Sequence, residues 1–180
     1  MKTATNMVWM DLEMTGLDPN KERIIEAALV VTDKDLNLLN EPVQYVIHQE
    51  DALLEAMDDW NTATHTRTGL IDRVKASSLS EQDVEEALLK YISVWIPAHK
   101  SPLCGNTIHQ DRRFLRAYMP RLDGYFHYRN VDVSSVKELA LRWKPSILKD
   151  WSKKGAHRAV DDVLESIEEM RYYREHFFKL

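Results

Sequence analysis

The feature that most constrains the fold of this chain is an apolar run, residues 8–16, that contains two carboxylates, Asp11 and Glu13. Gly16 and a turn-forming Asp-Pro-Asn sequence end the run, so we predict a strand. On a strand, residues i and i+2 point to the same face with Cα atoms roughly 6.5 Å apart. The two carboxylates are therefore expected to be neighbours. Their repulsion favours a bound cation, and oxygen-only ligands favour a hard divalent ion. The alternative is a solvated polar face near the sheet edge.

Length and composition predict a single domain over residues 1–180. The chain has 180 residues, of which 44% are hydrophobic, and this is enough for a substantial core. The beginning of the sequence lacks the features of a secretory signal, and no apolar run approaches the length that spans a bilayer. These features predict a cytoplasmic protein. The single cysteine, Cys104, is expected to be a small buried thiol.

Charge is unevenly distributed along the chain. Residues 111–158 contain twelve Lys and Arg and five Asp and Glu, a net charge of +7, which leaves −12 for the remainder of a chain whose total is −5. One basic zone on an acidic protein fits a small anionic ligand better than a long nucleic acid. The alternative is chance clustering of basic residues on solvated helix faces.

The order of predicted elements indicates an α/β fold. Three runs joined by short links, residues 8–16, 23–32 and 42–48, predict an antiparallel meander, and further strands are expected at 103–106 and 127–133. Helical patterns begin at Glu50, at Ser80, at Gln110, at Ser135 and at His157. Capping boxes are predicted for Ser80 with Asp83 and for Ser135 with Glu138. We expect a mixed five-stranded sheet flanked by helices.

Three well separated segments supply acidic residues that could converge on one site. Asp111 lies near the predicted start of a helix, and His157 precedes Asp162 at the start of the last helix. Four carboxylates can hold two divalent ions about 4 Å apart, a geometry used for in-line phosphoryl displacement. A histidine on a loop can accept the proton of an attacking water. For Asp111 alone, an ordinary helix-start aspartate is the alternative. Trp60 is interpreted as a core anchor or a base-stacking platform, and His65 as a hydrogen-bonded or exposed side chain.

The motifs around these residues resemble a known family. Residues 10–17, 105–115 and 157–162 are similar to the three exonuclease motifs of the DEDD superfamily, histidine subtype. Residues 57–61, 65–66, 128–129, 132–134 and 172–177 extend the match over nearly the full chain, and together they resemble the oligoribonuclease family. The resemblance implies a ribonuclease-H-like fold, two Mg²⁺ or Mn²⁺ ions and a homodimer. It also implies 3′→5′ exoribonuclease activity on very short RNA, above all 5′-phosphorylated dinucleotides.

The resemblance also implies a role for each matching residue. Asp11, Glu13, Asp111 and Asp162 would be metal ligands and His157 the general base. Leu17 and Trp60 would contact the two bases, and His65 the backbone near the scissile phosphate. Thr107, Arg129 and Ser134 would cap the 5′ phosphate, with Tyr128 reaching in from a partner subunit. Asp161 adjoins Asp162, and the motif spacing selects Asp162.

Two residues depart from the usual Gly-Asn-Ser-Ile-Gly-Gln-Asp motif of the family. Thr107 stands in place of Ser and keeps a hydroxyl donor, so the phosphate contact can be retained. His109 stands in place of Gly and adds bulk next to a metal ligand, where Gly could adopt backbone angles that His resists.

Two other functions are compatible with parts of the pattern. The first is a histidine-type exonuclease that acts on DNA 3′ ends or on tRNA tails, which would need a basic track beyond the site. The second is a module that binds dinucleotides without cleaving them. The presence of all five catalytic-type residues argues against a pure binder, because binding alone needs no general base.

Overall fold

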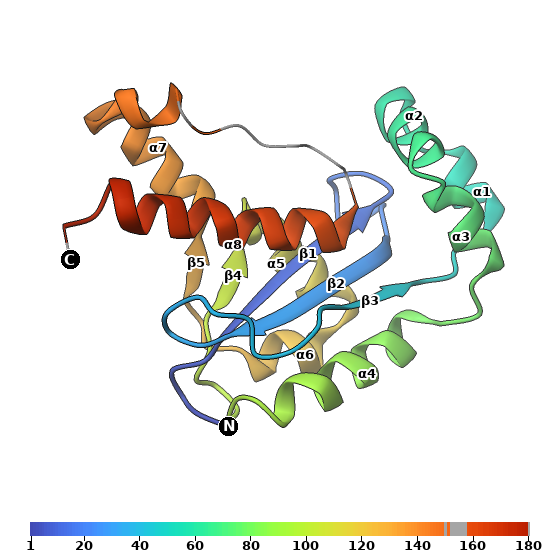
Figure 1. Cartoon of the computed structure of the whole chain (residues 1–180). Helices are drawn as coiled ribbons and strands as arrows, with labels where there is room; N and C mark the ends of the chain where they lie inside the picture. The colour runs from blue at the N-terminus through green and yellow to red at the C-terminus, as the bar shows by residue number, and fades with distance from the viewer. Residues whose placement is uncertain (150, 152–157, 180) are drawn as a thin grey trace.

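A computed structural model describes residues 1–149, 151 and 158–179. Its centre is a mixed five-stranded sheet with the strand order β3-β2-β1-β4-β5 (Figure 1). The strands are β1 (Met7–Met14), β2 (Ile24–Thr32), β3 (Val43–Val46), β4 (Leu103–Gly105) and β5 (Asn130–Asp132). The first three strands pair antiparallel, whereas β4 lies parallel to β1 and β5 parallel to β4. The predicted meander and the mixed α/β sheet are confirmed.

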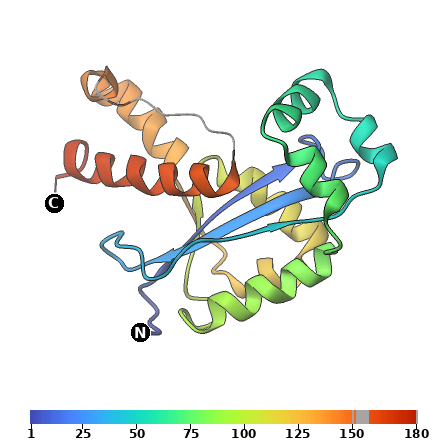
Figure 2. The ribbon, with the colours of Figure 1, turned by 45° about the vertical axis from the view of Figure 1, so that its right-hand side comes forward.

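Helices cover both faces of this sheet, as Figure 1 shows. One face packs against α4 (Glu81–Ser93), α5 (Ile108–Tyr118) and α6 (Pro120–Tyr125). The opposite face packs against α7 (Val133–Trp143), a 3₁₀ turn η1 (Pro145–Lys149) and α8 (Ala159–His176). Three short helices, α1 (Asp51–Glu55), α2 (Asp59–Arg67) and α3 (Leu70–Ala76), form a smaller group beside the end of β3 (Figure 2).

The side-chain alternation of β1 directs its two carboxylates toward α8. Val8, Met10 and Leu12 are buried in the cluster that contains α4, α5 and α6. Trp9 is buried on the other face with residues of α8, and its indole N–H donates to the hydroxyl of Thr32 at 3.0 Å. Because strand residues alternate between faces, the odd-numbered Asp11 and Glu13 share the face of Trp9. The sheet therefore presents both acids to α8.

Helix starts agree with the prediction at one capping box and differ at the other. Ser80 caps α4 and exchanges hydrogen bonds with Asp83, so the first capping box is confirmed. The box predicted for Ser135 with Glu138 is wrong, because α7 begins at Val133 with Asp132 as its N-cap. The Asp132 carboxylate accepts from the backbone N–H of Ser134 at 2.9 Å. Strand β5 runs directly into α7, so no separate loop is left for a later cap.

Two further predictions concern the cysteine and the absence of a membrane span. The thiol of Cys104 is buried in β4, as expected. Among the residues that the structure describes, no helix combines the length and apolar character needed to cross a membrane.

Candidate active site

Three carboxylates from two elements converge at the end of β1. Asp11 and Glu13 come from the strand, and Asp162 comes from the first turn of α8. One carboxylate oxygen of each residue lies within 4.8 Å of the other two. All three side chains are half-buried, whereas the adjacent Asp161 is exposed. The geometry thus brings Asp162, rather than Asp161, to the strand pair.

Asp111 reaches the same strand from α5, on the opposite face of the sheet. Its Oδ1 accepts from the backbone N–H of Leu12 at 2.9 Å, between the two acids of β1. This N–H needs a side-chain acceptor because β4 pairs with β1 only at Val8 and Trp9. Asp111 is buried. The aspartate therefore caps a sheet edge and stands beside the three-carboxylate group.

Gly105 permits the close approach of the segment that leads into α5. A Cβ at this position would lie 2.7 Å from the carbonyl oxygen of Met10 and 2.8 Å from the side chain of Ile108. Any side chain would push the start of α5, and with it Asp111, away from β1. The glycine is thus part of the site's framework.

In the absence of a cation, two of the acids have raised pKa values. Burial, followed by the charges of Asp162, Glu26 and Asp111, raises the pKa of Glu13 from 4.5 to about 8. Burial likewise raises the pKa of Asp111 from 3.8 to about 7. A divalent cation would relieve both costs by compensating the negative charge. Carboxylate oxygens are also the ligands that Mg²⁺ and Mn²⁺ prefer, so the residues present fit such ions.

A second polar cluster lies beside the acids, at the carboxyl ends of β4 and β5. The backbone N–H of Thr107 donates to Asp132 Oδ1 and to Ser134 Oγ, both at 2.9 Å. The hydroxyls of Thr107 and Ser134 are 3.0 Å apart. Arg129 and Tyr128 follow on the exposed approach to β5, with the guanidinium 5.4 Å from the tyrosine ring centre. We call Thr107 and Ser134, together with Arg129 on the approach to β5, the hydroxyl cap.

Comparisons with known proteins identify the family of the chain. Residues 8–170 match a family model described as an exonuclease. The oligoribonuclease of Neisseria meningitidis is 58% identical over 177 residues, which cover 98% of this chain and 95% of the relative. The oligoribonuclease of Salmonella typhimurium is 59% identical over 175 residues, 97% of each chain.

The chain belongs to the oligoribonuclease family. Members of this family are metal-dependent 3′→5′ exoribonucleases, and the chain is an enzyme of this class.

Solved structures confirm the fold at much lower identity. A structure of exonuclease I superposes with a TM-score of 0.75 at 17% identity and covers 95% of this chain. Exonuclease I from Methylocaldum szegediense gives a TM-score of 0.71 at 18% identity. The chain spans only 41% of either neighbour's length. The ribonuclease-H-like fold expected from the sequence is therefore confirmed.

The oligoribonuclease motif on α2 is positioned at the end of β1. His65 is buried, and its Nε2 lies 3.0 Å from the carbonyl oxygen of Met14. The side chain of Trp60, on the same helix, is 64% exposed, so its interpretation as a core anchor is wrong. Leu17, in the loop after β1, is 70% exposed. Both large apolar side chains are thus accessible to a ligand.

The two departures from the oligoribonuclease motif have different structural consequences. His109 adopts ordinary helical angles inside α5, and its Nδ1 lies 3.5 Å from Asp132 Oδ2. The left-handed position is instead Thr107, the N-cap of α5, with φ of 52°. The expected conflict at His109 is therefore absent, and the unusual backbone angle falls on Thr107.

One assigned residue cannot be placed, and three polar residues with structural roles were missed. His157, the expected general base, lies outside the described residues. Sequence reasoning did not assign Asn106, Glu26 or Glu169, of which the two glutamates are fully buried. Glu26 faces Glu13 across β1 and β2 and forms an ion pair with Arg73. A charged residue within an otherwise apolar strand run was the available signal for Glu26.

Proposed function

We propose that this enzyme degrades very short RNA, chiefly 5′-phosphorylated dinucleotides, to mononucleotides by two-metal-ion hydrolysis. The observation that carries the proposal is the position of the hydroxyl cap beside the carboxylates, where Thr107, between β4 and α5, meets Ser134 at the start of α7. One cluster is suited to cations and the other to a terminal phosphate. The oligoribonuclease relatives support RNA oligonucleotides as the substrate class.

The residues divide the chemistry between them. Asp11, Glu13, Asp111 and Asp162 would hold two Mg²⁺ or Mn²⁺ ions. Such ions activate a water and stabilise the charge on the leaving oxygen of a phosphodiester. His157 would accept the proton of the attacking water. Leu17 and Trp60, both exposed, would contact the bases, and His65 would support the backbone near the scissile phosphate.

The cap and the overall charge both favour a short substrate. Thr107, Ser134 and Arg129 would bind a 5′ phosphate and leave no continuation for a longer strand. A shallow depression of about 270 Å³ next to the cap is lined by His109, Arg113, Arg116 and Tyr128, among others, so the local charge is basic. The residues outside 111–158 carry a net charge of −12, the difference between −5 and +7, and would repel a trailing polyanion.

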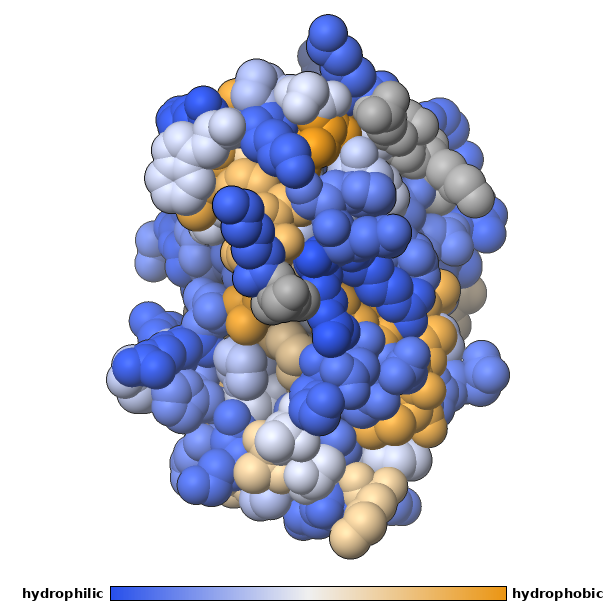
Figure 3. Space-filling model, turned by 60° about the vertical axis from the view of Figure 1, so that its left-hand side comes forward, coloured by the Kyte–Doolittle hydropathy of each residue, from blue (hydrophilic) through white to orange (hydrophobic). Residues whose placement is uncertain are grey.

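We also propose that the protein is a homodimer in which Tyr128 completes the partner's cap. The Tyr128 side chain is 71% exposed, so it is available for contact with a partner subunit. Figure 3 shows hydrophobic residues gathered in patches on an otherwise largely hydrophilic face. Exposed Leu141 and Trp143 of α7 supply further apolar surface for association.

Product analysis with labelled RNA tests the proposal. In Mn²⁺, the unmodified protein should convert a 5′-phosphorylated dinucleotide to mononucleotides faster than it shortens a long RNA at the same salt concentration. His157→Ala should lower the rate by at least about a hundredfold, because a general base contributes on this scale. Equal binding and cleavage of the long RNA would contradict the length preference.

The two alternative functions predict different outcomes in the same assay. Arg129→Ala should weaken cleavage of the 5′-phosphorylated dinucleotide, whereas an exonuclease for DNA ends or tRNA tails would tolerate the loss of this arginine. Binding of the dinucleotide without metal-dependent turnover would instead support a binding module.

A further inference from the structure

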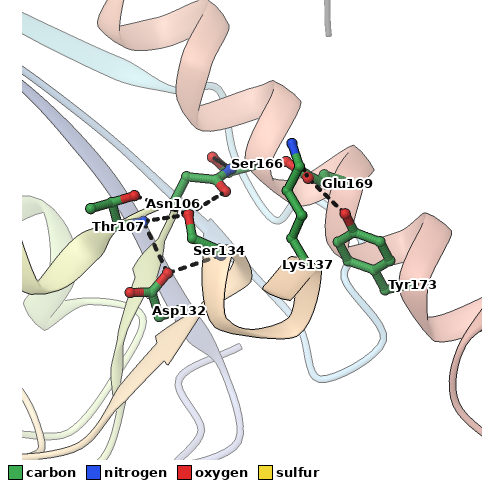
Figure 4. A network of polar contacts seen from close by, with 8 residues as sticks. All are labelled: Asn106, Thr107, Asp132, Ser134, Lys137, Ser166, Glu169 and Tyr173. Carbon is green, nitrogen blue, oxygen red and sulfur yellow. Dashed lines mark hydrogen bonds and ion pairs between the residues drawn. The ribbon is translucent and has the colours of Figure 1, made fainter. Parts of the chain in front are cut away.

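The side chain of Asn106 lies between the carboxylates and the hydroxyl cap, and its orientation is fixed by three hydrogen bonds. Its Nδ2 donates to Ser166 Oγ at 2.8 Å and to Glu169 Oε2 at 3.2 Å, both on α8. Its Oδ1 accepts from the hydroxyl of Ser134 on α7 at 3.0 Å. Figure 4 shows the amide between the two helices. Both amide hydrogens are thus directed to α8 and the amide oxygen to the cap.

These bonds extend in both directions to functional groups. The hydroxyl of Ser166 donates to the backbone carbonyl of Asp162 at 2.9 Å. On the other side, Ser134 Oγ accepts from the backbone N–H of Thr107 at 2.9 Å. A continuous series of hydrogen bonds therefore joins the backbone of one acid to both hydroxyls of the cap, through Asn106.

Glu169 accepts one of these hydrogen bonds and fixes the position of Asn106. Its side chain is fully buried, and it accepts from the hydroxyl of Tyr173 at 2.9 Å as well as from Asn106. Lys137 of α7 lies 3.6 Å from the same carboxylate. Packing of α8 against the sheet needs no buried charge, and burying one is costly unless it is fully paired. We therefore attribute the burial of the Glu169 carboxylate to its role in holding the amide of Asn106 (Figure 4).

We propose that Asn106 is a positioning residue that sets the separation between the Asp162 end of α8 and the hydroxyl cap, and thereby the preference for a 5′-phosphorylated dinucleotide. This inference rests on the proposed function. In a two-nucleotide substrate, the scissile and 5′ phosphates are separated by a short, nearly constant span. A cap held at the matching distance binds the 5′ phosphate while the scissile phosphate stays at the acids, and small displacements weaken reaction strongly.

The donor directions within the cap follow from the same bonds. Ser134 gives its only hydroxyl hydrogen to Asn106 and accepts from Thr107. The hydroxyl of Thr107 can therefore turn to donate to a phosphate, while the bond to Asn106 fixes the position of the Ser134 hydroxyl in the cap. Loss of the Asn106 amide releases the Ser134 hydroxyl and loosens the cap, without removing any carboxylate.

Two variants and a matched control test the inference. Asn106→Ala removes the amide, and Ser166→Ala removes one of its two partners on α8. Ser101→Ala is the control, because Ser101 also makes a buried hydrogen bond, from Val8 N–H at 2.9 Å, but at the opposite end of β1. For each protein, kcat/KM is measured in Mn²⁺ on a dinucleotide with a 5′ phosphate and on the same dinucleotide without it. The ratio of the two values is the 5′-phosphate preference.

The expected result is a change in this ratio rather than a uniform loss. Asn106→Ala should reduce the preference about tenfold and Ser166→Ala about threefold, the scale of a displaced hydrogen-bonded contact. Ser101→Ala should leave the ratio unchanged. Mn²⁺ affinity, measured by calorimetry, should change by a smaller factor than the 5′-phosphate preference in both test variants, because neither residue supplies a carboxylate to the site.

Equal loss on both dinucleotides in Asn106→Ala and Ser166→Ala would show a merely structural role and overturn the inference. Urea unfolding establishes that each variant is folded, and if Asn106→Ala does not fold, Ser166→Ala alone decides. An unmodified protein without any 5′-phosphate preference would contradict the proposed function itself. The assay of the unmodified protein alone reveals that outcome, and it would overturn this inference as well.

Discussion

Among single residues, Glu13 makes the stability of the metal-free protein depend on pH. Its pKa is raised from 4.5 to about 8 in the folded state, chiefly by burial, so the folded protein holds a proton that the unfolded chain releases. Stability contributed by this proton is present below about pH 4.5 and is lost as the pH rises to about 8. We expect the free energy of unfolding in EDTA to fall by a few kcal/mol, roughly, across this window. Urea titrations at intervals of pH measure it.

Glu13→Gln is the direct control for that prediction. The amide cannot titrate, so the slope of stability against pH should fall by roughly half in this variant, with the remainder due to Asp111, whose pKa is raised to about 7. Saturating Mg²⁺ or Mn²⁺ should stabilise the unmodified protein more at high pH than at low pH, because protons compete with the cation. An unchanged slope in Glu13→Gln would show that other groups cause the effect.

Sequence spacing predicted the acidic residues of the site but not the residues that hold them in place by hydrogen bonds. The two-residue spacing placed Asp11 and Glu13 on one face, and motif spacing distinguished Asp162 from Asp161. Asn106 gave no signal, because an asparagine after a short strand is an ordinary turn residue until its partners on α7 and α8 are known. Hydrogen bonds between residues sixty positions apart depend on packing that sequence spacing does not contain.

For whole elements, the two predicted capping boxes provide a matched comparison. Ser80 caps α4 through the backbone N–H of Asp83 at 3.1 Å, whereas Ser135 is an exposed residue inside α7. Ser80→Ala should lower the free energy of unfolding by about 1 kcal/mol. Ser135→Ala should change it by less than about 0.5 kcal/mol. Urea unfolding of both variants measures the difference, and equal effects would contradict the observed helix starts.

The error at Ser135 has a physical cause. A serine followed three positions later by glutamate satisfies the local rule for a helix start, but the rule does not register that β5 ends directly at Asp132. The Asp132 carboxylate already caps α7, so the serine falls within the first turns. Ser80 has no competing cap upstream, because Leu79 and its neighbours lie in a loop. Helix existence was thus predictable, and the exact start depended on tertiary connection.

The packing of α8 should control metal affinity as well as stability. Ile167 is buried between α8 and the sheet, one and a half turns after Asp162, whereas Leu88 is buried under α4 on the other face. Ile167→Ala and Leu88→Ala should each cost about 2–5 kcal/mol in unfolding free energy. Only Ile167→Ala should also weaken Mn²⁺ binding, measured by calorimetry on the folded variants, because α8 carries Asp162. Equal Mn²⁺ affinities would show that Asp162 is held independently of this packing.

At the scale of the molecule, the sequence predicted the sheet class and the set of converging motifs, but not the strand order on the β4 side. The parallel placement of β4 next to β1 brings the start of α5 to Leu12 and the hydroxyl cap beside the acids. This neighbourhood follows from crossovers through α4 and α5, which join strands far apart in the chain. The family resemblance supplied the convergence that periodicity alone could not.

Mixing two variants with different defects tests the proposed dimer. Asp162→Asn should abolish the metal site of its own subunit, and Tyr128→Ala should weaken the cap of its partner. In a mixed dimer, the subunit with an intact metal site receives Tyr128 from the Asp162→Asn subunit, so one of two sites is complete. After equal mixing and exchange, half of the dimers are mixed, and activity on the 5′-phosphorylated dinucleotide should recover to about a quarter of the unmodified level.

Activity equal to the average of the two separate variants would show that Tyr128 acts within its own subunit or that no dimer exchanges. A cross-linked mixed dimer, prepared by co-expression with two affinity tags, distinguishes these two cases, since it requires no exchange.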